Sequence, residues 1–233
     1  MESWEVLRQE RKFLLSEGQY LRLESQFSGL LHEDPNNGPD GYTVRSLYFD
    51  TMYDRDYGEK ISGVELRRKI RLRLYHPDDP FVLLELKQKQ GSNQLKRSIK
   101  LERSHAIRVA RGDYTPLLLY KDKFAVECYG LMNMHCYRPK VVVEYKRKAY
   151  ILQENSIRVT FDKEIRGSKG HLNFFDTDPG YCPVLEPWKV IFEVKYNHFL
   201  PSYLRDILRS CNKSEISVSK YCLAQEIYWI DSK

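Results

Sequence analysis

The sequence predicts an α+β fold in which eight β-strands form an antiparallel barrel and helices lie at both ends and in the middle of the chain. Eight segments have the period-two alternation, or the β-branched and aromatic content, that is typical of strands. They follow one another in mainly consecutive order, which favours antiparallel pairing. Hydrophobic residues make up 42% and charged residues 30% of the chain, as in an ordinary globular protein.

Each predicted strand is bounded by turn residues, as in the stretch EDPNNGPDG, residues 33–41. The strands cover residues 5–15, 42–50, 65–75, 80–89, 93–102, 140–150, 156–165 and 189–197.

Helices are predicted at four places between and after the strands. The first opens at Ser16, which forms a capping box with Gln19, and carries an apolar stripe of Leu23, Phe27, Leu30 and Leu31. The second covers residues 115–139, with Thr115 as N-cap and Pro116 as first helical residue. Two more close the chain at residues 200–211 and 217–229.

A single domain over residues 1–233 is the simplest organisation, because the sequence shows no internal repeat and no long flexible linker. The five cysteines are scattered without a Cys-x-x-Cys pair, which is typical of reduced thiols rather than of a zinc site. The first residues are charged, and no run reaches the roughly 18–20 apolar residues of a membrane span. We therefore expect a cytoplasmic location.

Cations and carboxylates recur on one face of most predicted strands. In KIRLRLY, Lys69, Arg71 and Arg73 alternate with aliphatic residues, so they stand on one face. The same pattern places together Glu10 with Lys12, Glu85 with Lys87, Lys96 with Lys100, Arg158 with Asp162, and Glu193 with Lys195. One interpretation is a set of outward faces in water.

The other interpretation is a barrel whose charged faces point inward and whose apolar faces are covered by the helices. Like charges on neighbouring strands are destabilising, so an inward arrangement makes sense when an anion lies between them. Arg and Lys suit the oxygens of a ligand with several phosphates, and carboxylates beside phosphates suit Mg²⁺ or Mn²⁺.

Eight stretches in order resemble the VTC domain, the polyphosphate polymerase domain of the vacuolar transporter chaperone family, which also occurs as a stand-alone bacterial protein. They are ERKFLL, VRSLYFDT, KIRLRLY, LELKQK, VVVEYKRKAY, IRVTFD, FEVKYN and SVSKYCLA. The resemblance implies a triphosphate tunnel fold, related to the CYTH triphosphatases. It also implies transfer of the γ-phosphoryl group of ATP to a polyphosphate chain with Mn²⁺ or Mg²⁺ as cofactor.

The resemblance also implies roles for individual residues. Those that hold the reacting phosphates are Arg71, Arg73, Lys87, Arg147, Arg158 and Lys195. Further substrate contacts are Lys12, Lys69, Lys96 and Lys220. Glu193 is the metal ligand, and Glu10 assists it. Alternation alone would place Lys146 rather than Arg147 on the charged face, and the family pattern favours Arg147.

One departure separates the chain from the related triphosphatases, whose first strand reads Glu-x-Glu-x-Lys. The aligned residues here are Arg8, Glu10 and Lys12, so the first carboxylate is missing, which favours a polymerase. A tunnel-fold triphosphatase or cyclase and a non-catalytic polyphosphate or nucleotide binder stay open as alternatives. The expected partners are ATP and polyphosphate, with no nucleic acid. A membrane protein that exports the polymer stays open, as does the oligomeric state.

Overall fold

The computed structural model describes residues 8–91, 93–170, 172–211, 215–217 and 219–226. It confirms the α+β class and all eight predicted strands. These are β1 (Arg8–Ser16), β3 (Tyr42–Asp50), β4 (Arg67–Leu74), β5 (Phe81–Gln90), β6 (Asn93–Glu102), β7 (Arg138–Leu152), β8 (Ile157–Lys169) and β10 (Lys189–Asn197). The strand order is β1-β10-β8-β7-β3-β4-β5-β6. Two short strands were not predicted, β2 (His32–Glu33) and β9 (Cys182–Pro183).

The first helix, α1 (Glu17–Leu30), begins where the sequence predicts it. Ser16 is its N-cap, and the capping box with Gln19 is present in both directions. Its buried face carries Tyr20, Leu23 and Phe27, whereas Leu30 is 47% exposed, so its place in the predicted stripe is wrong. The remaining helical segments of six residues or more are α2 (Arg55–Ile61), α3 (Arg103–Ala110), α4 (Lys123–Met134), α5 (Ser202–Arg209) and α6 (Lys220–Glu226).

The prediction of one helix over residues 115–139 is wrong. A 3₁₀ turn, η1 (Thr115–Leu119), is followed by α4, and β7 already begins at Arg138. Thr115 is the first residue of η1, and the residue before it is the N-cap. The backbone N–H and the hydroxyl of Thr115 both donate to Asp113. Asp122 caps α4 instead, accepting from two backbone N–H groups of the first turn.

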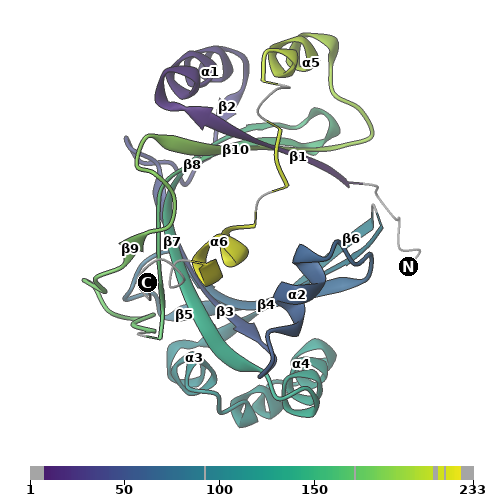
Figure 1. Cartoon of the computed structure of the whole chain (residues 1–233), viewed down its shortest axis with the longest axis vertical. Helices are drawn as coiled ribbons and strands as arrows, with labels where there is room; N and C mark the ends of the chain where they lie inside the picture. Colours follow the sequence, from purple (N-terminus) through teal and green to yellow (C-terminus); the bar gives the residue numbers. More distant parts are fainter. Residues whose placement is uncertain (1–7, 92, 171, 212–214, 218, 227–233) are drawn as a thin grey trace. The chain divides into compact units, whose positions relative to one another are not determined.

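The chain divides into two compact units, and the prediction of a single domain stays a prediction. Unit 1 comprises Met1–Thr43, Tyr145–Ile165 and Leu185–Val218. In it β1 pairs with β10 and β10 with β8, both antiparallel. Their apolar faces, with Phe13, Phe161 and Phe192, are covered by α1 and α5, which lie on the same side of β1 and β10 (Figure 1).

Unit 2 comprises Val44–Glu144, Arg166–Val184 and Ser219–Lys233. In it β3, β4, β5 and β6 pair in that order, antiparallel throughout. The apolar faces of β4 and β5 pack against α3 and α4, while α6 lies on the other side of these strands (Figure 1). The apolar face of the strands is therefore covered by α1 and α5 in unit 1 and by α3 and α4 in unit 2, and the charged side chains lie on the opposite face.

Candidate functional site

The twelve predicted site residues fall into two groups, one in each unit. Unit 1 carries Glu10, Lys12, Arg147, Arg158, Glu193 and Lys195. Unit 2 carries Lys69, Arg71, Arg73, Lys87, Lys96 and Lys220. We call these two sets the unit 1 face and the unit 2 face.

The unit 2 face begins with three lysines in one row across neighbouring strands. Lys69 of β4 is in register with Lys87 of β5, and Lys87 is in register with Lys96 of β6. Directly opposite residues on adjacent strands have Cβ atoms about 5 Å apart. Such a row of like charges is unfavourable unless negative charge lies nearby.

Glu85 supplies one negative charge in the next row. It is 1% exposed, and its Oε2 accepts from Arg71 Nε and lies 2.6 Å from Arg71 Nη2. Lys96 pairs with its other oxygen, and Arg73 Nε lies 3.8 Å from Oε2. Burial raises the pKa of Glu85, but Arg71, Arg73 and Lys96 outweigh this and bring it to about 2. Glu85 is therefore a carboxylate held by three cations.

Arg73 and Arg71 differ in what surrounds them. Arg73 is 8% exposed, and its Nε makes no hydrogen bond within the described ranges. Arg71 also donates from Nη1 to the Tyr48 hydroxyl, 3.0 Å away, and its guanidinium lies over that ring. Burial raises the pKa of Tyr48, but Arg71, Arg73 and Lys69 lower it below its usual value. The positive charge of these three residues thus favours the ionised form of the Tyr48 hydroxyl.

Lys220 is the first residue of α6, and Ser219 and Tyr221 on either side of it both contact Lys69. Lys69 Nζ donates to Ser219 Oγ at 2.5 Å and lies 5.8 Å from the Tyr221 ring centroid. The Tyr221 hydroxyl donates to the fully buried Asp50, which also accepts from the backbone N–H groups of Asp56 and Tyr57. One carboxylate therefore holds both α2 and α6.

On the unit 1 face, acids and bases alternate between two strands. Glu10 of β1 is in register with Lys195 of β10, and Lys12 is in register with Glu193. Lys12 Nζ lies 2.5 Å from Glu10, and Lys195 pairs with Glu193 and lies 3.8 Å from Glu10. Burial lowers the pKa of Lys195 below its usual value despite both carboxylates. Each carboxylate thus has an opposite charge beside it.

Arg158 extends this arrangement to β8, where it is in register with Lys195. Its Nη2 lies 2.6 Å from the buried Asp34 carboxylate and donates to the Tyr42 hydroxyl at 3.0 Å. Burial raises the pKa of Asp34, but hydrogen bonds from Asn36 and the charge of Arg158 lower it overall. Arg158 is 32% exposed, so part of its guanidinium stays accessible to a ligand.

Arg147 of β7 is nearly buried, and Asp162 accepts from its Nε at 2.7 Å and from its Nη2 at 2.8 Å. Burial lowers the pKa of Arg147, but Asp162 raises it well above its usual value. Lys146 instead pairs with Glu164 where both are half exposed. Of the two residues Arg147 is therefore the buried one and Lys146 lies at the surface, while the role of Arg147 stays a prediction.

A family model for the VTC domain matches residues 7–228. The chain belongs to the VTC domain family. Among curated protein sequences, none matches it. The match covers all twelve predicted site residues, although it tests none of their roles.

Solved structures share the fold of this VTC domain. A Bacillus halodurans protein whose proposed activity is that of an adenylate cyclase has a TM-score of 0.56 at 14% identity, covering 90% of this chain and 92% of that chain. The PH1819 protein of Pyrococcus horikoshii has a TM-score of 0.49 at 12% identity, over 94% of this chain and 98% of that one. At 14% identity the likeness to the Bacillus halodurans protein shows a shared fold and nothing about activity.

Four residues that shape the site are not among the twelve predicted ones. Glu85 and Asp162 stand on the predicted charged faces, so alternation was a sufficient signal for both. Tyr48 lies in β3, where seven consecutive residues are buried, so no alternation marks it. Asp34 lies in the loop after β2, where only its contact with Arg158 reveals it. Within the described ranges no three His, Cys, Asp or Glu side chains form a metal-binding group.

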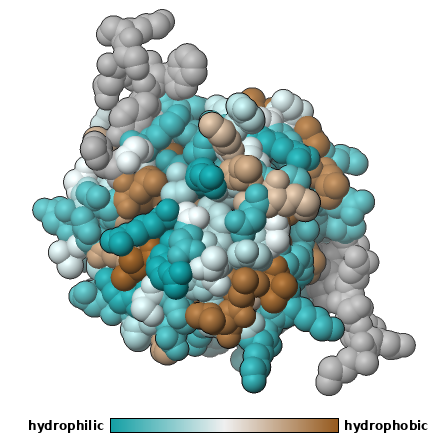
Figure 2. Space-filling view, turned by 90° about the horizontal axis from the view of Figure 1, so that it is seen from below, coloured by the Kyte–Doolittle hydropathy of each residue, from teal (hydrophilic) through white to brown (hydrophobic). Residues whose placement is uncertain are grey.

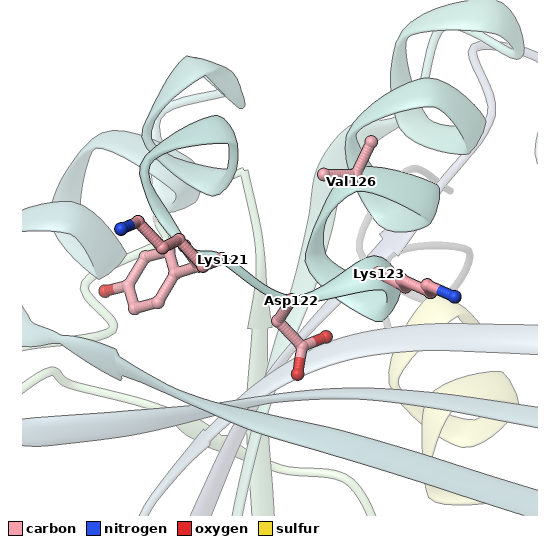
Figure 3. Close-up of a pocket in the computed structure, with 5 residues that line it drawn as sticks. Lys121, Asp122, Lys123 and Val126 are labelled. Carbon is pink, nitrogen blue, oxygen red and sulfur yellow. The ribbon is translucent and has the colours of Figure 1, made fainter.

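Two surface features lie away from these faces. A shallow pocket between η1 and α4 is lined by Tyr120, Lys121, Asp122, Lys123 and Val126, and its two lysines point away from each other (Figure 3). Hydrophobic residues on one side of the molecule form several separate groups among hydrophilic ones (Figure 2). Neither feature gathers cations around a shared space. Every helix among the described residues is too short or too polar to span a lipid bilayer.

Proposed function

We propose that this VTC domain is a polyphosphate polymerase that transfers the γ-phosphoryl group of ATP to a growing chain of inorganic phosphate. The observation that carries the proposal is the two basic faces on the strands of a VTC domain, with Lys69, Lys87 and Lys96 in register on one of them. Rows of cations at strand spacing suit a ligand that carries a charge on every phosphate.

In this proposal the arginines orient the phosphate groups by hydrogen bonds, and the lysines neutralise the negative charge of the phosphates. The planar guanidinium groups of Arg71, Arg73 and Arg158 fix the direction of phosphate oxygens, because Arg can donate two parallel hydrogen bonds. The lysines, with Lys220 at the start of α6, act as compact point charges along the chain. Arg147 is held by Asp162 and contributes positive potential from a nearly buried position.

We also propose that Glu193, assisted by Glu10, holds Mn²⁺ or Mg²⁺. The two carboxylates come from neighbouring strands and lie on one face, and both approach Lys195. Two carboxylates, completed by phosphate oxygens and water, are a donor set that Mg²⁺ accepts. When bound, the metal would neutralise charge on the phosphate oxygens. Lys195 lies beside both carboxylates, so in this proposal its ammonium group moves away from them when the metal binds.

In the proposed reaction the protein places the end of the polyphosphate chain next to the γ-phosphate of ATP. A terminal oxygen of the polyphosphate chain attacks the γ-phosphorus of ATP, a new P–O bond forms, and the bond to the oxygen bridging the β- and γ-phosphorus atoms breaks, releasing ADP. Phosphoryl transfer needs little covalent help from a protein, so in-line placement and charge stabilisation supply most of the acceleration. The chain grows by one phosphate for each ADP released.

Incubation of the purified protein with ATP and Mn²⁺ or Mg²⁺ tests the proposal. A polymerase gives ADP and long phosphate chains. Release of orthophosphate alone would favour the tunnel-fold triphosphatase, and binding without turnover would favour the non-catalytic binder. We further propose a cytoplasmic location with ATP and polyphosphate as the ligands, and association with a membrane only through a partner.

A further inference from the structure

Glu85 is a carboxylate that contacts three cations of the unit 2 face, Arg71, Arg73 and Lys96. It is almost fully buried, yet it lies among cations that the proposed function assigns to phosphate. Its Oε2 engages Arg71 through both Nε and Nη2, which form the edge that would grip a phosphate at two points. Its other oxygen engages Lys96, from the neighbouring strand β6.

A carboxylate in this position can occupy the hydrogen-bond donors that a phosphate group would otherwise use. Both groups present anionic oxygens to the same N–H donors, so they compete for them. Burial disfavours the charged form of Glu85, but the three neighbouring cations keep the pKa near 2, so the group stays ionised at physiological pH. A phosphate that takes Arg71 must therefore displace or share a full negative charge.

We propose that Glu85 is a built-in competitor of phosphate, and that it sets how tightly the unit 2 face holds a polyphosphate chain. A polymer that must advance by one phosphate in each cycle needs sites that are favourable enough to enter and weak enough to leave. Uniformly tight binding would lower KM without helping the chemical step. The inference rests on the proposed phosphate-binding role of this face, but it does not require that the product is a polymer.

The test compares Glu85→Gln with the wild type and with Glu127→Gln. Glu127 pairs with Arg97 on the outer side of β6, so its replacement removes the same charge from unit 2 away from the face. Titration calorimetry with tripolyphosphate, without nucleotide or metal, gives the affinity at fixed ionic strength. We expect E85Q to bind about tenfold more tightly or better, because a charge within a few Å is removed, and E127Q to bind as the wild type does.

Thermal unfolding provides a second measurement, because E85Q leaves three cations without their carboxylate. Tripolyphosphate should raise the melting temperature of E85Q more than that of the wild type, since at a fixed concentration a ligand that binds more tightly stabilises the native state more. Folding of E85Q only in the presence of tripolyphosphate would also support the inference. Equal or weaker binding by E85Q, or no folding in either condition, would overturn it.

The result is independent of the outcome for the proposed function. If the wild type makes no polymer but E85Q binds tripolyphosphate more tightly, the polymerase proposal fails and the role of Glu85 stands. If the wild type makes polymer and E85Q binds as the wild type does, the role of Glu85 fails alone. Where both stand, E85Q should show a lower KM for polyphosphate together with a lower kcat, because release slows.

Discussion

Arg147 and Asp162 form a buried two-point ion pair, with Asp162 fully buried and accepting from both Nε and Nη2 of Arg147. Removing one partner of such a pair leaves the other charge buried without compensation. Asp162→Asn should therefore lower the free energy of unfolding by about 3–5 kcal/mol, measured by urea denaturation. Asp206→Asn, which affects the exposed pair with Arg209, is the control and should change little. Equal effects of the two variants would contradict the role of this pair.

The Tyr221 hydroxyl donates a hydrogen bond to Asp50 and so holds α6 in place. The positions of Ser219 and Lys220 depend on this contact. Tyr221→Phe removes the hydroxyl but keeps the ring, so the loss is that of a hydrogen bond to a charged group, about 1.5–3 kcal/mol. Amide hydrogen exchange in residues 220–226 should become faster than in the wild type. Tyr203→Phe, at a half-exposed position of α5, is the matched control. Unchanged exchange in α6 would show that the hydroxyl does not hold the helix.

Asp56 predicts a dependence of stability on pH. Burial, and then the nearby Asp50, raise its pKa from 3.8 to about 7, against the opposing effects of Tyr137 and Arg68; Glu59 raises it further. The folded state binds this proton more tightly than the unfolded state, so the contribution is complete below about pH 3.8 and is lost as the pH rises through about 7.

The wild type should therefore lose stability between about pH 5 and about pH 8 relative to Asp56→Asn, which cannot titrate, by at most about 1.4 kcal/mol per pH unit. Urea denaturation of both proteins across this range provides the measurement. Parallel curves for the two proteins would show that Asp56 is ionised throughout.

Glu193 is the proposed metal ligand, so Glu193→Gln should raise the Mn²⁺ concentration for half-maximal activity by about ten- to hundredfold or more. Mn²⁺ binding measured by electron paramagnetic resonance should weaken in parallel. Glu164→Gln, which removes an exposed carboxylate from the same unit, should leave the metal dependence unchanged. A change in KM for ATP with no change in metal affinity would assign Glu193 to another task.

The strands could be predicted because most of them have one apolar face and one charged face. In β4, for example, Ile70, Leu72 and Leu74 are buried on the face opposite the cations. That signal fails where a strand is buried on both faces. In β7 the residues from Val141 to Tyr145 are all buried, so alternation carries no information about the phase of Arg147.

The helices were predicted less well than the strands. α2 has seven residues, which is too short for a clear helical period, and Asp50 at the end of β3 accepts hydrogen bonds from two of its backbone N–H groups. The segment 115–139 has helical composition, but the cap at Asp122 starts a new helix inside it. The predicted helix 217–229 is present as α6 up to Glu226, and its last residues lie outside the described ones. The roles of the twelve site residues stay predictions.

ATP is the proposed donor for chain growth on the basic faces, so the fate of its γ-phosphorus distinguishes chain growth from hydrolysis. The purified protein is incubated with γ-labelled ATP and Mn²⁺, and the products are separated by length. We predict label in long phosphate chains, one ADP for each phosphate added, and a loss of at least about a hundredfold in rate for Arg73→Ala, since a buried positioning cation is removed. Label only in orthophosphate, or an unchanged rate for Arg73→Ala, would contradict the account.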